Sequence, residues 1–281
     1  EIGAIIDEAS MCLLTGGSAI AARPLIYDAR AALGRSGAPY GQYLLNDILA
    51  GRAAPRMQVF LSAWQLTAEQ RQKLAQQRTA GTWKSMLSWF GLGRASDVMR
   101  VWCWAPGYVY PERRDVAGIE AATGFKARPV ALPTAAVTPT ALGRTQGLAL
   151  AWGPKTKIEP LFSVEAEQDD IWATYSDGSP AVAVRRTRAG YDVFVGVPQL
   201  TPELIAALAK LAGVHRYAAP GNALWAANNH LSIQALETGA VTLDVGSSGA
   251  VYDALDAVKI GEGPCVRLNL EQGEVRVLRW E

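Results

Sequence analysis

The stretch MQVFLSAWQLTAEQRQKLAQQR, residues 57–78, places a strand, a turn and a helix directly after one another. Residues 59–61 form a short apolar run that is typical of a parallel strand buried on both faces. Thr67 and Gln70 have the spacing of a capping box, which predicts that a helix begins just after Thr67. The stretch is therefore a predicted βα unit. Its loop, 62–65, lies at the carboxyl end of the strand, where ligands collect in doubly wound folds.

Apolar runs alternate with amphipathic segments on both sides of this unit. The other strands expected before the last helix are 2–6, 39–45, 98–104, 171–175, 181–185 and 191–197. The other expected helices are 20–33, one that Pro111 opens and Gly124 ends, and one from the Thr201-Pro202 cap to Gly213. Residues 128–154 suggest irregular β structure. The pattern predicts an α/β fold with a flavodoxin-like, doubly wound, mostly parallel sheet that ends in a meander.

The C-terminal residues have a different pattern. Residues 231–281 carry only strand signals, separated by glycines. This predicts a small antiparallel β sandwich, so we expect two domains, 1–232 and 233–281.

The composition excludes several classes of protein. Among 281 residues, 27 Lys and Arg balance 26 Asp and Glu, and no run of like charges occurs, so neither nucleic acid nor a membrane surface is an expected partner. Three widely spaced cysteines without a CxxC pair argue against a disulfide framework and a zinc site, and no metal or cofactor is expected. No apolar run approaches the ~18 residues of a membrane span.

The expected location and the first residue are two further predictions. Reduced thiols favour a soluble, cytoplasmic protein, although the composition also permits a secreted parent. The chain begins with Glu1 rather than Met, and a strand is expected almost at once. We therefore expect a piece of a longer chain.

Five stretches, in order along the chain, resemble the glutamine-amidotransferase-like domain of certain glycoside hydrolases, the β-galactosidase trimerisation domain. They are IIDEAS at 5–10, YLLNDI at 43–48, FLSAWQLT at 60–67, WAPGY at 104–108, and DGSPAV at 177–182 with the strand that ends at Gly196. The resemblance covers roughly residues 2–235, and the remainder is similar to the small β domain that ends such enzymes.

The resemblance implies an accessory role. A retaining glycosidase needs two carboxyl groups ~5 Å apart, and in this family both come from a catalytic (β/α)8 barrel that this sequence does not contain. The implied partners are that barrel, in the same parent chain, and further copies in a homo-oligomer, with carbohydrate as a possible ligand. The segment alone is expected not to cleave sugars.

Cys103 is the candidate for a catalytic nucleophile, because active amidotransferase-like folds place a cysteine after a central strand and activate it with a histidine. It precedes Trp104, however, and is expected within the strand, where a thiol is usually inert. Residues 196–203 contain no histidine, and His215 and His230 follow the last helix. A hydrolase or amidase that uses Cys103 is therefore an alternative, and we expect no catalytic residue in this segment.

Five residues at the expected strand ends are candidates for contact with a substrate or an interface: Asp7, Glu8, Trp64, Trp104 and Tyr108. Aromatic faces stack on sugar rings and fill interface pockets, which also permits a carbohydrate-binding module that acts through Trp64 and Trp104. The alternatives are core packing for the aromatic residues and capping of a turn for the acids. Gly16-Gly17-Ser18 before a helix permits a phosphate site, but a plain turn explains it better.

A segment between glycines resembles an insertion into the fold. Trp83, Met86, Leu87 and Phe90 occur at helical spacing within it. So much apolar surface predicts a subunit or domain contact, and an internal lid over the sheet edge is the alternative.

Overall fold

The computed structural model describes residues 1–13, 21–77 and 98–281. The chain divides into two compact units. One consists of Glu1–Ile2, Arg30–Gly41 and Thr201–Glu281, and the other of Gly3–Ala29 and Gln42–Leu200. The predicted insertion with Trp83, Met86, Leu87 and Phe90, and the turn at Gly16-Gly17-Ser18, lie outside the described residues.

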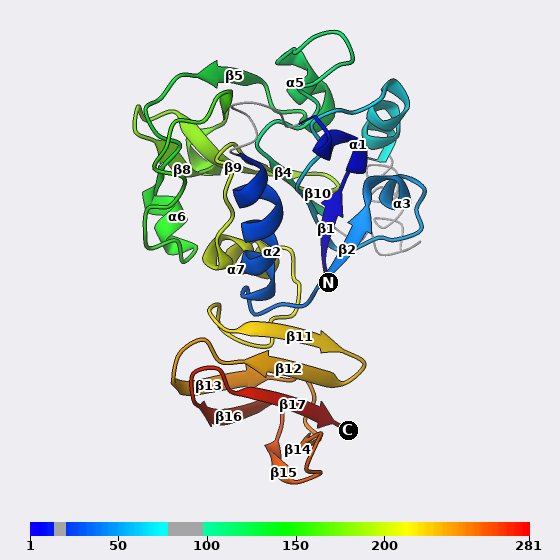
Figure 1. Cartoon of the computed structure of the whole chain (residues 1–281), viewed down its shortest axis with the longest axis vertical. Coiled ribbons are helices and arrows are strands. Elements are labelled where there is room, and N and C mark those ends of the chain that lie inside the picture. Colours follow the sequence, from blue (N-terminus) through cyan, green and yellow to red (C-terminus); the bar gives the residue numbers. More distant parts are fainter. Residues whose placement is uncertain (14–20, 78–97) are drawn as a thin grey trace. The chain divides into compact units, whose positions relative to one another are not determined.

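An eight-stranded sheet organises the α/β part of the chain (Figure 1). Its strand order is β2-β1-β3-β4-β10-β9-β8-β6. In that order the strands are Tyr40–Leu44, Ile2–Ile6, Met57–Phe60, Val98–Cys103, Gly190–Val195, Pro180–Thr187, Ile171–Tyr175 and Val137–Pro139. The strands expected at 2–6, 39–45 and 98–104 are therefore confirmed.

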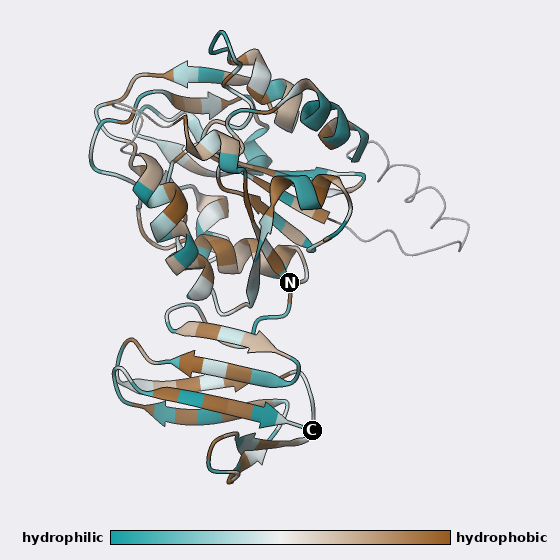
Figure 2. Cartoon of the chain, turned by 45° about the vertical axis from the view of Figure 1, so that its right-hand side comes forward, coloured by the Kyte–Doolittle hydropathy of each residue, from teal (hydrophilic) through white to brown (hydrophobic). Residues whose placement is uncertain are grey.

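The centre of this sheet is parallel and buried. β4 pairs in parallel with β3 on one side and with β10 on the other. All four residues of β3 are buried, as are the last five of β4, because the strands are covered on both faces; all of these side chains except Gln58 and Arg100 are apolar. Figure 2 shows these strands largely in the colours of hydrophobic residues. The core of the sheet thus holds β3 and β4 firmly, together with the loops that follow them.

The expected meander forms the other side of the sheet. β10 pairs antiparallel with β9, β9 with β8, and β8 with β6. The coarse prediction, a large mostly parallel sheet in a mixed α/β fold, agrees with the structure.

Helical segments connect these strands. They are α1 (Glu8–Met11), the π-helical segment η2 (Arg23–Asp28), α2 (Ala29–Gly34), α3 (Leu45–Leu49), the helical residues 68–77, α5 (Ala117–Thr123), α6 (Ala141–Thr145), the short 3-10 helix η3 (Gln168–Asp170) and α7 (Pro202–Leu211). Among the residues that the structure describes, no helix is long and apolar enough to cross a bilayer.

Two predicted helix starts are confirmed by their hydrogen bonds. The Gln70 backbone N–H donates to Thr67 Oγ1 at 3.1 Å, and the Thr67 N–H donates to Gln70 Oε1 at 2.8 Å, which is a complete capping box. At α7 the Leu204 N–H donates to Thr201 Oγ1 at 3.2 Å.

The predicted start of α5 at Pro111 is wrong. The helix begins at Ala117, because the preceding residues form a tight hairpin-like loop: the Tyr110 N–H donates to the Arg113 carbonyl at 2.8 Å, and the Asp115 N–H to the Tyr108 carbonyl at 2.9 Å. The predicted end is right, since Gly124 terminates the helix with φ of 74°.

The region 128–154, expected as irregular β structure, also contains a helix. β5 (Ala127–Val130) pairs with β7 (Leu161–Val164), and β6 joins the large sheet. The helix α6 follows β6 in the chain and precedes β7, and the sequence did not predict it. Its cap is Thr140, whose Oγ1 accepts from the Gly143 N–H at 3.1 Å.

The C-terminal residues form antiparallel sheets, as expected. One has the order β11-β12-β17-β14-β15 and the other pairs β13 with β16. These strands are Ala223–Ala227, His230–Gln234, Val275–Trp280, Ala250–Asp253, Lys259–Glu262, Gly239–Asp244 and Cys265–Leu270. Apolar side chains of both sheets share one core. The predicted boundary between residues 232 and 233 falls inside β12, and the strand pairing begins at Ala223.

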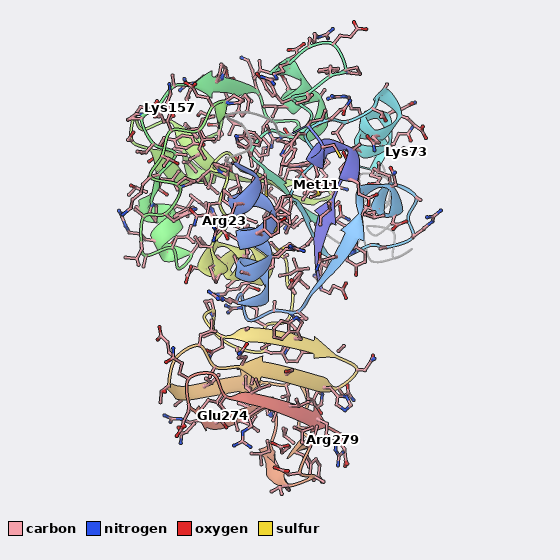
Figure 3. All side chains as sticks on the ribbon, viewed as in Figure 1. Met11, Arg23, Lys73, Lys157, Glu274 and Arg279 are labelled. Atoms are coloured by element: carbon pink, nitrogen blue, oxygen red, sulfur yellow. The ribbon has the colours of Figure 1, made fainter. Side chains whose placement is uncertain are left out.

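Charged side chains line the surface of each unit. Figure 3 shows Lys73, Lys157 and Glu274 among them, and each forms an ion pair, with Glu69, Glu159 and Arg276 respectively. These pairs are solvent-exposed and contribute little to stability.

Candidate functional site at the carboxyl ends of the parallel strands

The loops that follow β1 and β3 are joined by hydrogen bonds. The Asp7 N–H donates to Ser62 Oγ at 2.8 Å, and Ser62 is fully buried. The Ser10 hydroxyl lies between the two loops, accepting from the Gln65 N–H at 2.8 Å and donating to the Gln65 carbonyl at 3.2 Å. The carboxyl ends of β1 and β3 therefore form one rigid surface.

The loop after β4 continues this surface. The Gly107 N–H donates to the Ala63 carbonyl at 2.8 Å, and the Val109 N–H donates to the Trp64 carbonyl at 2.9 Å. These bonds align the two loops in parallel, as the bridge between Gln65 and Val109 also shows.

Trp104 occupies a strained position at the end of β4. Its φ is 63°, in the left-handed region that bulky residues rarely adopt. Three contacts hold it there. Its backbone N–H donates to the Val195 carbonyl and its indole N–H to the Pro160 carbonyl, both at 2.8 Å, and its ring packs edge to face with Trp64 at 5.7 Å between centroids.

Arg71, on the helix after β3, fixes the loop after β4. Its guanidinium donates to the carbonyls of Leu66, Gly107 and Gly118 at 3.1, 2.9 and 3.2 Å. The same group lies 4.1 Å from the centre of the Tyr110 ring. Burial lowers the pKa of Arg71, an effect that Tyr110 and Asp115 oppose.

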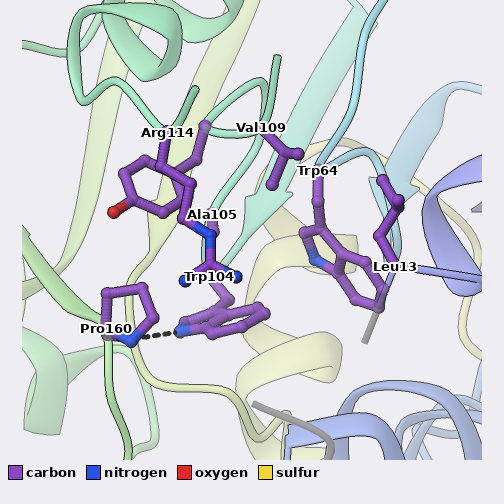
Figure 4. Close-up of a pocket in the computed structure, with 8 residues that line it drawn as sticks. Leu13, Trp64, Trp104, Ala105, Val109, Arg114 and Pro160 are labelled. Atoms are coloured by element: carbon purple, nitrogen blue, oxygen red, sulfur yellow. Dashed lines mark hydrogen bonds between the residues drawn. The ribbon is translucent and has the colours of Figure 1, made fainter. Parts of the chain in front are cut away.

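These loops enclose a small pocket of about 30 Å³ (Figure 4). It is lined by Leu13, Trp64, Trp104, Ala105, Tyr108, Val109, Arg114 and Pro160. Most of this surface is apolar. The Trp64 indole N–H is buried and has no hydrogen-bond partner among the described residues, whereas that of Trp104 is satisfied by Pro160.

Cys103 lies in a poor environment for a nucleophile. It is the last residue of β4 and is 1% exposed. Burial raises the pKa of its thiol to about 12, so the thiolate is scarcely populated at neutral pH. His215 contacts the Asp244 carbonyl and His230 the Asn228 carbonyl, both in the unit that lacks Cys103. No described residue near the thiol supplies the histidine base.

Asp7 and Glu8 differ in their exposure to solvent. Asp7 is largely buried and caps α1, since its Oδ2 accepts from the Ser10 N–H at 2.9 Å. This is the capping role that the sequence offered as the alternative. Glu8 is exposed. A role for either acid in contacts with a substrate or interface stays a prediction.

The predicted aromatic residues do come together. Trp64 is 1% exposed and Trp104 is 3% exposed, which agrees with the core-packing alternative. Tyr108 is half-buried and packs edge to face with Phe162 at 4.9 Å between centroids. Trp64 and Trp104 therefore present no open ring face, and only parts of them line the pocket.

Other elements of the site were not predicted. Arg71 and Arg114 carry its cationic groups, and Pro160 supplies a hydrogen-bond acceptor from a distant loop. Two of the carbonyls that Arg71 binds, and the Pro160 carbonyl that Trp104 binds, lie far along the chain from these side chains, so no local spacing could indicate them. Among the described residues no cluster of His, Cys, Asp or Glu could hold a metal ion.

Comparisons with known proteins show a similarity of structure, but none of sequence families. No family model matches the sequence, and no curated protein matches it. The structure is similar to three solved β-galactosidases, from Bacillus circulans sp. alkalophilus (TM-score 0.66, 14% identity), G. stearothermophilus (Gan42B, described as GH42; 0.63, 12%) and Rahnella sp. R3 (0.64, 14%).

The similarity covers nearly all of this chain but less than half of each β-galactosidase chain. The matches cover 100%, 100% and 98% of this chain, but only 41%, 40% and 40% of the β-galactosidase chains. The chain thus has the fold of a part of these glycoside hydrolases. At such low identity the similarity establishes the fold alone.

Proposed function

We propose that this chain is a non-catalytic accessory region of a β-galactosidase-like glycoside hydrolase, which packs against a catalytic (β/α)8 barrel and takes part in oligomerisation. The observation that carries the proposal is the similarity of the whole chain to about two fifths of β-galactosidase chains. A fold that occurs as part of a larger enzyme is expected to serve that enzyme.

The site supports the non-catalytic part of the proposal. The buried thiol of Cys103 has no histidine partner among the described residues, and Asp7 serves as a helix cap. A retaining glycosidase needs two carboxyl groups ~5 Å apart across a sugar site. The carboxyl edge of the parallel strands offers an aromatic pocket instead.

The finer family assignment is part of the same proposal. The strand order β2-β1-β3-β4-β10 is the order 2-1-3-4-5 of flavodoxin-like sheets, when the five strands are counted along the chain. This order, with the quoted sequence stretches, supports a glutamine-amidotransferase-like domain of the trimerisation type. The C-terminal sheets then correspond to the small β domain.

A kinetic assay tests the proposal. The purified chain is incubated with a chromogenic β-galactoside, and separately with glutamine and simple amides. We expect no turnover above the uncatalysed rate with any of them. Hydrolysis of the galactoside by the chain alone would contradict the proposal, and amide hydrolysis that Cys103→Ala abolishes would replace it with the hydrolase alternative.

The oligomerisation component needs a separate measurement. Sedimentation velocity of the chain over a range of concentrations is expected to show reversible self-association. A strictly monomeric chain at all concentrations would remove oligomerisation from the proposed function and leave the accessory role to be judged by the kinetic assay.

A further inference from the structure

The strand β13 is paired on one side and open along most of the other. Among the described residues it pairs with β16 alone, in a two-stranded sheet (Figure 1). Two hydrogen bonds, both of 2.8 Å, show which backbone groups face which side. The Val245 N–H donates to the Pro264 carbonyl, on the side of β16, whereas the Asp244 N–H donates to the Tyr217 carbonyl, on the opposite side.

The groups that follow Asp244 along this open side are the backbone N–H and C=O of Thr242 and Ala240. They face away from β16, as those of Asp244 do, because the direction of backbone groups alternates along an antiparallel strand. Both residues are exposed, and no described residue forms a hydrogen bond with their backbone groups at this edge. Tyr217 thus occupies the edge at Asp244, and the pairing groups of two further residues are available beyond it.

A hollow of about 500 Å³ lies along this part of the edge. Residues 239–241 of β13 line it, and residues 220–222 line it as well. All of its lining residues belong to one compact unit of the chain. A Cβ built at Gly239 would meet nothing within 4 Å, which agrees with open space beside the strand.

The strip 217–222 is joined to the β13 region at its two ends. One joint is the bond from the Asp244 N–H, and the other is the Leu236 N–H, which donates to Asn222 Oδ1 at 3.0 Å. Between these ends the strip bonds elsewhere, since the Gly221 N–H donates to the Arg35 carbonyl at 2.9 Å. The strip therefore leaves the middle of the β13 edge unpaired.

This edge lacks the features that commonly protect an edge strand. Charged side chains, prolines and bulges discourage an added strand. β15, an edge of the other C-terminal sheet, carries Lys259 and Glu262 and has an irregular register. Residues 239–243 have no charge, no proline and no bulge. This part of β13 is thus suited to pairing with another strand.

We propose that the free edge of β13 binds a short extended segment of another polypeptide, which pairs with the backbone groups of Ala240 and Thr242 as a third strand of the β13–β16 sheet. The edge offers N–H and C=O groups in alternation, and an extended polypeptide matches that alternation. Pro202 and Pro220 line the hollow, so an apolar side chain of the segment packs there. A volume of about 500 Å³ is that of a small-ligand site and admits only a few residues.

The segment comes from a separate polypeptide rather than from β13 of a second copy. A second copy that offered its own β13 edge would have to bring its strip 217–222, which lies beside that edge, into the same hollow. The inference concerns one unit of this chain and does not rest on the proposed accessory role, so either can fail without the other.

Nuclear magnetic resonance of the backbone amides tests the proposal on the intact chain. The probe is a capped pentapeptide of alternating threonine and valine. It is expected to shift the N–H signals of Ala240 and Thr242 saturably, with a Kd on the order of 1 mM, and to slow their exchange with water at least fivefold. The same peptide with every amide nitrogen methylated cannot donate hydrogen bonds and should produce neither effect.

Two proline variants provide a matched pair. Ala240→Pro removes an N–H that faces away from β16, a position at which an edge strand tolerates proline, and should weaken peptide binding at least tenfold. Ala226→Pro makes the same change at the edge of the other sheet, in β11, where the N–H also faces away from the neighbouring strand; it should bind as the wild type does. The methylated peptide leaves the protein unchanged, so the test does not depend on how either variant folds.

Three results would overturn the proposal: no saturable shift at Ala240 and Thr242, an equal effect of the methylated peptide, or equal shifts at Leu224 and Ala226 on the β11 edge. Sedimentation velocity tests the choice of partner. Self-association that Ala240→Pro abolishes and Ala226→Pro retains would assign the edge to a second copy and contradict that choice, whereas equal behaviour of the two variants agrees with a separate polypeptide.

Discussion

Burial of a single thiol decides how the end of β4 behaves chemically. Cys103 is 1% exposed and its pKa is raised to about 12, while Cys12 and Cys265 are exposed. We therefore predict that a thiol reagent at pH 8 modifies Cys12 and Cys265 quickly, and Cys103 only at the rate of unfolding. Quantitative labelling followed by peptide mass spectrometry measures all three, and rapid modification of Cys103 in the folded chain would contradict its buried environment.

The same raised pKa predicts an alkaline loss of stability. The unfolded thiol ionises near pH 9, but the folded thiol does so only near pH 12. The folded state thus holds the proton more tightly, so the contribution is complete below pH 9 and is lost as pH rises toward 12, by at most about 1.4 kcal/mol per pH unit. Urea unfolding between pH 8 and 11 should show a shallower decline for Cys103→Ala than for wild type. Parallel declines would show that this thiol is not the cause.

At this scale the sequence predicted some residues well. The order Cys103-Trp104 placed the thiol inside the strand, where the structure has it. The burial of Trp64 and Trp104 was one of two open alternatives, because a tryptophan at a strand end suits both a contact surface and a core. The burial of the Trp64 indole N–H, without a partner among the described residues, depends on the positions of several loops, and no sequence spacing reports that.

The loop between β4 and α5 depends on a close approach of two glycines. Gly107 has φ of 70°, and a Cβ built there would lie 2.6 Å from the Gly118 carbonyl oxygen. We predict that Gly107→Ala destabilises the fold by about 2–5 kcal/mol, from backbone strain and steric overlap together.

Gly51 provides the matched control for this prediction. Its φ is also 70°, but a Cβ there meets nothing within 4 Å. Gly51→Ala should therefore cost only the strain, about 1–2 kcal/mol. Equal losses in the two variants, measured by chemical denaturation, would show that the approach of Gly107 to Gly118 is not tight in solution.

Arg71 makes a second testable contribution to this loop. Arg71→Lys keeps the charge but loses the forked geometry that reaches three carbonyls, so we expect a loss of about 2 kcal/mol and faster amide exchange at Gly107 and Val109. Arg52→Lys, which alters an exposed ion pair with Asp47, should change neither. Unchanged exchange at Gly107 in Arg71→Lys would contradict the role of Arg71 in holding the loop.

Helix caps were the most predictable elements. Thr67 with Gln70, and Thr201, carry their signals within four residues, and the structure has the expected bonds. The start of α5 was misplaced because Pro111 suits a turn as well as a first helical residue. The helix α6 was missed because its five residues bury little apolar surface of their own.

At the scale of the whole molecule, the architecture was largely predictable from the sequence. Alternating apolar runs indicated the mixed α/β part and the antiparallel C-terminal sheets, since burial on one or both faces sets those patterns. β12, in which the predicted domain boundary lies, pairs with β17 more than 40 residues further along the chain, and local sequence patterns do not report such a pairing. The similarity of the chain to about 40% of each β-galactosidase is the basis of the proposed accessory role.

The most direct measurement is therefore the nucleotide sequence on both sides of the segment that encodes these 281 residues. An accessory region of a glycoside hydrolase predicts an in-frame upstream sequence with repeated strand-helix units of a (β/α)8 barrel and two carboxylic acids at strand ends. A reading frame that contains no such barrel on either side would contradict the central claim.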